Sequence, residues 1–241
     1  MKSLQHRNRQ PELMDDPLLD EQTHRRALAG LRRVNWWSRT DAAVWKALKE
    51  AAAVRPVSSR EPLRILDIAS GGGDLAIRLA RRFEAAGIPV VLDGCDISPL
   101  AVDFATRQAH AAQVKNLRFF QHDILRQELP SGGYDVAMCS LFLHHLDEQD
   151  AVRLMATMQQ TARHMVIVDD LRRTAIGYWL AWIGCRVLTR CHVVHQDGPM
   201  SVEGAFTNDE VLELAGNAGL RDVRLRNHWP QRFVLTGRPL A

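Results

Sequence analysis

Hydrophobic positions divide this chain of 241 residues into helical and extended stretches that follow one another over most of its length. The first dozen residues are polar and are expected to be frayed, with an ordered extended lead-in over residues 11–17. Leucines and tryptophans then recur at three- and four-residue spacing over residues 20–34 and 38–54, which predicts two helices. Ser38 is the expected N-cap of the second helix.

From residue 63 onward, short apolar runs alternate with amphipathic segments. Regular alternation of this kind is typical of a parallel sheet with helices on both faces. Two final runs lie close enough together to form a hairpin at the sheet edge. The sequence therefore predicts an α/β fold: a Rossmann-like doubly wound, mostly parallel seven-stranded sheet with a C-terminal antiparallel hairpin and added N-terminal helices. The expected strands are residues 63–68, 90–95, 117–121, 134–139, 165–168, 223–227 and 232–236.

Two prolines mark a break over residues 55–62. We therefore divide the chain into an N-terminal helical lid region, residues 1–60, and a core, residues 61–241. An extra apolar helix is expected at about residues 174–191, after the fifth strand. It falls in an insertion over about residues 172–201, on the side of the sheet where ligands bind.

A glycine-rich turn follows the first expected strand. Asp67 ends that strand, Gly71–Gly73 follow it, and an amphipathic helix comes next. Glycines can adopt positive φ and allow a ligand to approach bare backbone. The first N–H groups of a helix can bind an acceptor group. This order predicts a site for a nucleotide-like ligand.

Acidic residues also end the second and third expected strands, and the carboxyl ends of parallel strands share one ligand-binding edge. Asp96 follows the glycine turn at about the 20-residue spacing of a ribose-binding acid. Asp123 could accept a hydrogen bond from a purine amine, and Asp67 would place negative charge near a cationic part of the ligand. Each acid alone is more often a helix cap or a loop residue, but the combination favours a nucleotide-like cofactor.

These residues carry a resemblance to class I S-adenosylmethionine-dependent methyltransferases, over residues 63–237. The run Leu66–Gly73 looks like their motif I. Asp96, Asp123-Ile124 and Tyr134–Leu141 look like the next three motifs, in the usual order and spacing.

Shorter stretches resemble particular groups of bacterial enzymes. The region Asn35–Arg39 is similar to small members near the ubiquinone/menaquinone-biosynthesis methyltransferases. Residues 11–15 and 195–201 resemble small enzymes that accompany type III polyketide synthases.

The resemblance implies S-adenosyl-L-methionine as the cofactor. It implies Asp67 near the methionine ammonium, Asp96 at the ribose, Asp123 at the adenine amine, and Gly71 and Gly73 along the methionine moiety. A sulfonium cation suits an acid-rich rim better than a pyrophosphate does. The expected cofactor-binding residues are Asp67, Ala69, Ser70, Gly71, Gly73, Asp96, Ile97, Asp123, Ile124, Cys139, Ser140 and Arg39. Ala69 stands where the family often has glycine, and a small residue still fits.

The N-terminal region supplies a lid in this interpretation, with Arg39 and Asn35 closing over the cofactor's carboxylate. A rival interpretation also remains, because residues 71–76 match the dinucleotide pattern G-x-G-x-x-A. An NAD-dependent oxidoreductase is less favoured, since Asp67 and Asp123 would have no evident NAD role. A non-catalytic cofactor-binding protein is the other alternative.

Histidines are the candidates for acid–base chemistry. A phenolic acceptor has a pKa near 10, so a general base would help at neutral pH. His144 and His145 follow the fourth strand, and His195 and Asp197 follow the extra apolar helix. We favour His145 or His195 as the base, with Asp197 as an orienting partner and His144 as a further candidate. Any one of them could instead cap or pack a loop.

No metal is expected. Cys185, Cys191, His192 and His195 match no standard zinc spacing. The pair Asp169-Asp170 lacks the partner acid–asparagine pair of cation-dependent catechol methyltransferases.

Composition indicates which classes of binding partner to expect. Thirty-one basic and 28 acidic residues give a mixed surface of net charge +3, which is not a nucleic-acid footprint. The most apolar window, residues 176–191, is shorter than the roughly 20 residues that cross a bilayer, so no stable membrane insertion is expected. Its aromatic residues fit an acceptor pocket or a homodimer face. The N-terminus is not a secretory signal, and four cysteines without a C-x-x-C pair fit a cytoplasmic protein.

The sequence thus predicts methyl transfer from S-adenosyl-L-methionine to a small apolar aromatic acceptor. The oxygen of a phenolic or polyketide-like compound is the first choice, and carbon methylation of a quinone precursor is the alternative.

Overall fold

A seven-stranded sheet forms the centre of the protein, with strand order β3-β2-β1-β4-β5-β7-β6. The computed structural model describes residues 4–16, 18–54 and 61–240. Strands β1 to β5 pair in parallel, and β7 runs antiparallel to both β5 and β6. The predicted fold class and the C-terminal hairpin are confirmed. The strands are β1 (Leu63–Ile68), β2 (Val90–Asp96), β3 (Leu117–Gln121), β4 (Tyr134–Ser140), β5 (Ala162–Leu171), β6 (Arg221–His228) and β7 (Arg232–Arg238).

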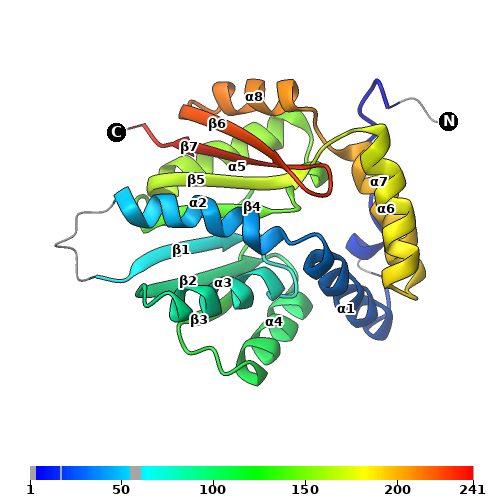
Figure 1. Ribbon diagram of the computed structural model, residues 1–241, viewed down its shortest axis with the longest axis horizontal. Helices are drawn as coiled ribbons and strands as arrows, with labels where there is room; N and C mark the ends of the chain where they lie inside the picture. The colour runs from blue at the N-terminus through cyan, green and yellow to red at the C-terminus, as the bar shows by residue number, and fades with distance from the viewer. Residues whose placement is uncertain (1–3, 17, 55–60, 241) are drawn as a thin grey trace.

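Helices cover both faces of this sheet and one of its ends (Figure 1). Buried side chains of α5 and α8 pack on one face, and those of α2 and α3 pack on the other, which gives three layers. The helical elements are η1 (Leu13–Asp15), α1 (Glu21–Trp37), α2 (Thr40–Val54), α3 (Asp74–Ala85), α4 (Pro99–Ala111), η2 (Leu143–His145), α5 (Glu148–Thr161), α6 (Ala175–Leu188), α7 (His192–Gly204) and α8 (Asn208–Asn217).

The apolar helix expected after β5, at about residues 174–191, is α6. A second helix that the sequence analysis did not predict, α7, follows it and includes Pro199. A side chain at Gly198 would collide with the Sγ of Cys185 on α6, so the glycine lets the two helices approach closely. Tertiary packing here outweighs the poor helix propensity of the Gly198-Pro199 pair.

Ser38 is not the N-cap of the second helix. It is the C-cap of α1, and its Oγ bonds the carbonyl of Asn35 and the hydroxyl of Thr40. The break predicted at residues 55–62 lies mostly outside the described residues.

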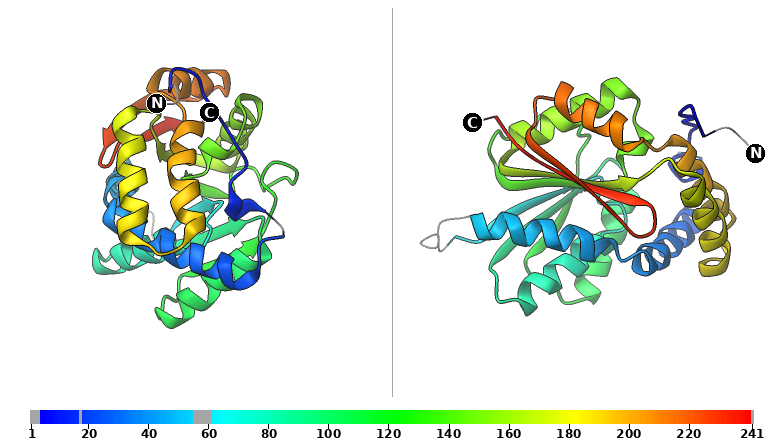
Figure 2. Two further views of the ribbon diagram at one scale, coloured as in Figure 1. Left: turned by 90° about the vertical axis from the view of Figure 1, so that its right-hand side faces the viewer. Right: turned by 45° about the horizontal axis from the view of Figure 1, so that its top comes forward.

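Helices α1, α6 and α7 gather at the carboxyl ends of the parallel strands (Figure 1), and α6 and α7 stand side by side there (Figure 2). The N-terminal segment runs beside them. It is not frayed over its described part, because the Arg7 guanidinium donates to the carbonyls of Gly204, His144 and Leu146. The same guanidinium lies 3.6 Å from the centre of the Phe206 ring. These contacts fix a segment that local sequence marks as mobile.

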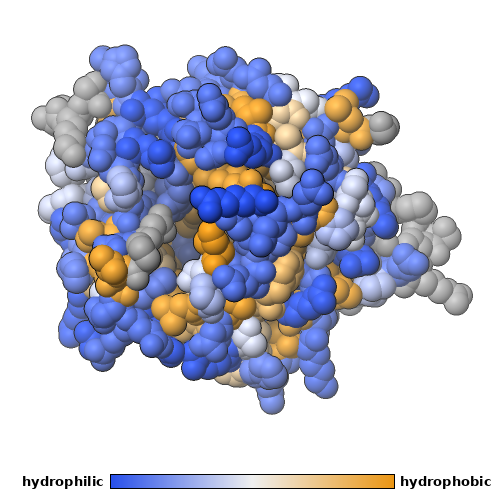
Figure 3. Space-filling model, turned by 180° about the vertical axis from the view of Figure 1, so that it is seen from behind, coloured by the Kyte–Doolittle hydropathy of each residue, from blue (hydrophilic) through white to orange (hydrophobic). Residues whose placement is uncertain are grey.

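The surface seen from behind is mostly hydrophilic, with hydrophobic residues in separate patches (Figure 3). Helix α6 exposes several large apolar side chains, among them Trp179, Ile183 and Val187. Among the described helices, none has the length and apolar character that crossing a membrane requires.

Candidate functional site

A cavity of about 960 Å³ opens where the parallel strands end and where α1, α6 and α7 cover the sheet. Asp67, Asp96 and Asp123 line one part of it, which we call the acid end. Glu12, His144 and His145 line another part, which we call the histidine end. One cavity therefore joins the predicted cofactor rim to two of the predicted catalytic histidines.

Asp96 is fixed by the two turns on either side of it. Its Oδ2 accepts a hydrogen bond from the N–H of Gly71 at 2.8 Å, and its Oδ1 accepts from the N–H of Ser98 at 2.9 Å. Ser98 in turn caps α4. Because each carboxylate oxygen can accept a second hydrogen bond, Asp96 can also bind the hydroxyls of a ligand. Asp123 is held similarly, since its Oδ1 accepts from the N–H of Leu125.

Asp67 is a buried carboxyl group on the cavity wall. Burial, together with the nearby charges of Asp74, Asp96 and Asp169, raises the pKa of Asp67 well above its usual value. A positively charged group placed beside it would favour the ionised carboxylate. The acid end therefore suits a cationic ligand.

Several buried polar atoms along this wall have no hydrogen-bond partner among the described residues. They include Ser70 Oγ and His122 Nε2. Gly71 has a φ of +52°, and open space lies where its side chain would stand. Unpaired buried polar atoms are costly, so a bound polar ligand would stabilise the wall. The residues present thus fit the ribose, amine and ammonium groups of S-adenosylmethionine.

Three residues predicted to bind the cofactor do not line the cavity. Gly73 is the N-cap of α3, with a φ of +74°, and a side chain there would lie 2.6 Å from Phe119, so its role is close packing. Cys139 belongs to the hydrophobic core. Arg39 is exposed, at the left-handed turn between α1 and α2. The predicted residues that do line the cavity are Asp67, Ala69, Ser70, Gly71, Asp96, Ile97, Asp123, Ile124 and Ser140.

Arg232 is a buried cation that the sequence analysis missed. Its guanidinium pairs with Asp169 and donates to Thr40 Oγ1 at 2.6 Å and to Ser140 Oγ at 3.2 Å. This network joins the start of α2 to β4, β5 and β7. The side chain is 2% exposed and lines the cavity, and its Nε has no partner among the described residues. Arg232 therefore brings a positive charge to the cavity wall, which the exposed Arg39 does not line.

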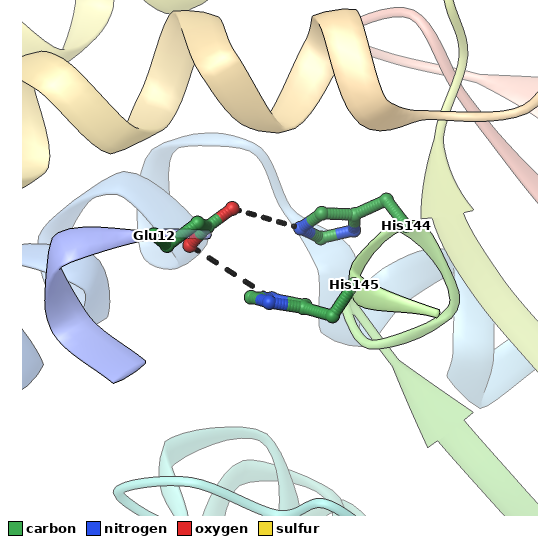
Figure 4. A group of neighbouring side chains, drawn as sticks. All are labelled: Glu12, His144 and His145. Atoms are coloured by element: carbon green, nitrogen blue, oxygen red, sulfur yellow. Dashed lines mark ion pairs between the residues drawn. The ribbon is translucent and has the colours of Figure 1, made fainter. Parts of the chain in front are cut away.

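Glu12, His144 and His145 converge at the histidine end (Figure 4). The Nε2 of His144 lies 3.5 Å from one Glu12 oxygen, and the Nε2 of His145 lies 3.8 Å from the other. The Nδ1 of His144 contacts Asp170 Oδ1 at 2.6 Å. Burial disfavours the charged imidazole, but Asp170 and Glu12 outweigh it and raise the pKa of His144 to about 10. Two imidazoles thus face one carboxylate across the cavity wall.

The predicted pair of His195 and Asp197 does not form. The Nε2 of His195 contacts the carbonyl of Thr189 at 2.9 Å, and His195 does not line the cavity. Asp197, two residues along the same helix, accepts from the N–H groups of Leu13 and Met14 instead. Asp197 therefore positions the segment that carries Glu12, and it does not orient His195.

Glu12 is a cavity carboxylate to which the sequence analysis gave no role. It lies in a polar run with no periodicity, more than 100 residues before its partners, and the resemblance of residues 11–15 to polyketide-associated enzymes was the local signal that pointed to this segment. The groups that were weighed for a metal have other contacts. Cys185 packs under α7, Asp169 pairs with Arg232, and Asp170 contacts His144.

Comparisons with known proteins all point to methyltransferases. Residues 65–164 match a family model described as "Methyltransferase domain". The chain is 36% identical over 89 residues to a demethylmenaquinone methyltransferase of Deinococcus radiodurans, over 37% of this chain and 35% of that protein. It is 29% identical over 174 residues to a ubiquinone biosynthesis O-methyltransferase of Acinetobacter baylyi, over 69% of this chain and 70% of that one.

Among solved structures, human N-acetylserotonin methyltransferase in complex with SAM superposes with a TM-score of 0.64 at 18% identity. That match covers 91% of this chain and 57% of the human one. A SAM-dependent methyltransferase from Aquifex aeolicus has a TM-score of 0.57 at 17% identity, over 80% of this chain and 87% of that one. These likenesses confirm the fold. The chain spans 35% to 61% of the length of the first curated relatives that it matches.

Proposed function

We propose that this chain, whose residues 65–164 form a methyltransferase domain of the S-adenosylmethionine-dependent family, methylates the oxygen of a small phenolic or polyketide-like acceptor. One observation carries the proposal. A single cavity joins the acid end, which fits the cofactor, to a Glu–His–His cluster at the other end. Apolar side chains such as Leu28, Leu31 and Leu180 also line the cavity and suit an aromatic ring.

S-adenosylmethionine supplies an electrophilic methyl group when it is bound. Asp96 and Asp123 would hold its ribose and adenine amine, and Asp67 would face its ammonium group. The described residues then have two tasks: they hold the acceptor in line with the methyl group, and they accept the proton of its hydroxyl.

His145 is the preferred proton acceptor of the two histidines. Both ring nitrogens of His144 already face a carboxylate, Asp170 on one side and Glu12 on the other. His145 lines the cavity with its side chain 23% exposed, and its Nε2 lies 3.8 Å from a Glu12 oxygen. The proposed lid, residues 1–60, contributes Glu12 and the α1 residues of the apolar wall.

Carbon methylation of a quinone precursor is the second candidate. One named relative, the demethylmenaquinone methyltransferase, supports it, whereas the other is named an O-methyltransferase. An oxygen acceptor agrees better with the histidine end, because a hydroxyl group must lose a proton when its oxygen is methylated.

Mass spectrometry separates these candidates. The protein is incubated with panels of phenols and quinols and with S-adenosylmethionine carrying an isotope-labelled methyl group. The proposal expects one labelled methyl in the product, released by reagents that cleave aryl methyl ethers. A label that resists ether cleavage supports carbon methylation. A chain that binds S-adenosylhomocysteine but labels neither panel contradicts both.

A further inference from the structure

Glu12, His144 and His145 bring three metal-binding groups to one place on the cavity wall (Figure 4). One ligand atom from each lies within 4.8 Å of the other two. Two imidazoles and one carboxylate form the donor set of many catalytic zinc sites and of the iron(II) sites with two histidines and one carboxylate. We propose that these three residues bind a divalent transition-metal ion of the Zn²⁺ or Fe²⁺ kind.

The distances favour a metal ion over direct hydrogen bonds. The two Nε2–Oε distances, 3.5 and 3.8 Å, exceed the usual N–H···O range of about 2.7–3.2 Å. Two ligands bound tetrahedrally at about 2.0 Å from one ion lie about 3.3 Å apart. A small contraction of Glu12, His144 and His145 around an ion would produce that geometry.

Outer contacts orient the ligands as metal sites require. Asp170 Oδ1 lies 2.6 Å from His144 Nδ1, and its other oxygen accepts from the backbone N–H of the same histidine. A carboxylate on Nδ1 fixes the tautomer whose Nε2 lone pair points at the ion. Ser201 on α7 donates its hydroxyl to a Glu12 oxygen. Two of the three proposed ligands, His144 and Glu12, are thus held in place by neighbouring residues.

The charges of the site are compatible with a dication. Asp170 is buried and the Glu12 side chain is 12% exposed, and a divalent ion held by neutral imidazoles would compensate both carboxylates.

The remaining coordination positions would face the cavity, since all three ligands lie on its wall. If the proposed function holds, the acceptor hydroxyl occupies one of them. The ion would then lower the pKa of that hydroxyl, the proton would pass to solvent, and the imidazoles would act as ligands instead of bases. This role rests on the proposed function, whereas metal binding itself does not.

Metal titration of the chelator-treated full chain tests the site. Calorimetry with Zn²⁺ is expected to show one ion per chain, and Co²⁺ is expected to give visible absorption bands of a low-symmetry site. Glu12→Gln and His145→Ala should each weaken Zn²⁺ binding by at least about 100-fold, and Asp170→Asn by about 10-fold. Thermal melting of each variant checks that it folds.

Two control variants separate the site from its surroundings. Glu203→Gln removes the carboxylate that holds Asn8 of the N-terminal segment but no ligand, and His164→Ala removes an exposed histidine. Both should bind Zn²⁺ like the parent. Absence of binding overturns the site, and so does binding that survives in both Glu12→Gln and His145→Ala.

A separate measurement addresses the role in methyl transfer. S-adenosylhomocysteine should bind the metal-free protein with unchanged affinity, because the acid end contains no proposed ligand. Methyl transfer that continues at full rate after chelation overturns the role of the ion in deprotonation, while the metal titration alone decides whether the site exists.

Discussion

The two ends of the cavity are built in opposite ways. At the acid end, Asp67, Asp96 and Asp123 each stand at or within two residues of the end of a parallel strand, so adjacent strands deliver them together. At the histidine end, Glu12 comes from the N-terminal segment and His144 and His145 come from η2. The first end is encoded by local motifs at fixed spacing, and the second depends on long-range packing. Changes in the packed segments can therefore alter the acceptor without disturbing the cofactor.

The largest expected effect is a loss of turnover in a variant of the histidine end that still binds the cofactor. His145→Ala should lower kcat about 1000-fold, or about 4 kcal/mol, because it removes a group that deprotonates the acceptor or binds the ion that does so. Steady-state kinetics with the acceptor found by mass spectrometry measures this loss. Calorimetry with S-adenosylhomocysteine is the control and should show unchanged affinity. A parallel loss of cofactor affinity would mean that the two ends are not independent.

The next effect concerns Arg232, the buried cation on the cavity wall. Arg232→Met should lower the free energy of unfolding by about 3 kcal/mol, because it removes the arginine that pairs with the buried Asp169 and leaves that carboxylate only Ser140 and His228. Urea denaturation measures the loss. Adding Asp169→Asn removes the stranded charge and should recover much of the stability. A double variant no more stable than the single one would show that Arg232 acts by packing and not by charge.

At the acid end, Asp96→Ala should weaken S-adenosylhomocysteine binding about 30-fold, or about 2 kcal/mol, through lost hydrogen bonds to a charged acceptor. Calorimetry gives the affinity, and Asp209→Ala, an exposed acid on α8, serves as the matched control. Turnover at saturating cofactor should change far less than affinity. Unchanged affinity would remove Asp96 from the cofactor site.

The smallest effect is a gain in stability. The pKa of Asp67 is raised in the folded state. Its carboxyl group therefore contributes fully to folding stability below its unfolded-state pKa of about 3.9, and that contribution is lost as the pH rises. Asp67→Asn avoids that loss, so the ligand-free variant should melt a few degrees higher at pH 7, on the order of 1 kcal/mol, and the gap should shrink toward pH 4. Melting curves across pH measure it. A variant that melts lower at pH 7 would show that the carboxylate stabilises the ligand-free fold.

The local sequence pattern was sufficient to predict the sheet and most of the residues that line the acid end. A strand that ends in Asp67 and runs into glycines predicts both the element and the ligand edge, and the spacing to Asp96 needs no knowledge of distant contacts. Two residues predicted for this end, Gly73 and Arg39, do not line the cavity, and local geometry explains why. Gly73 was assigned to the ligand, but its missing side chain makes room for Phe119. Arg39 was given a lid role, but the left-handed turn exposes it.

The histidine end could be predicted only in part. Position after a strand pointed to His144 and His145, but nothing near Glu12 or Arg232 in the sequence indicates a buried partner. The polar N-terminal run was expected to be frayed because propensity describes only local preference. Its order comes from Arg7 and from Asp197, which lie almost 200 residues apart in sequence. The assignment of Asp197 to His195 failed for the same reason.

The anchoring of Arg7 to the carbonyl of Gly204 has a consequence for the order of assembly during synthesis. Glu12 leaves the ribosome first, yet the α7 residues that hold its segment leave some 190 residues later. The strands that carry the acid end are complete once residue 121 has emerged, and domains generally fold as they are synthesised. A nascent chain should therefore present its cofactor edge well before the histidine end closes, which would leave the N-terminal segment without its docking partners for most of translation.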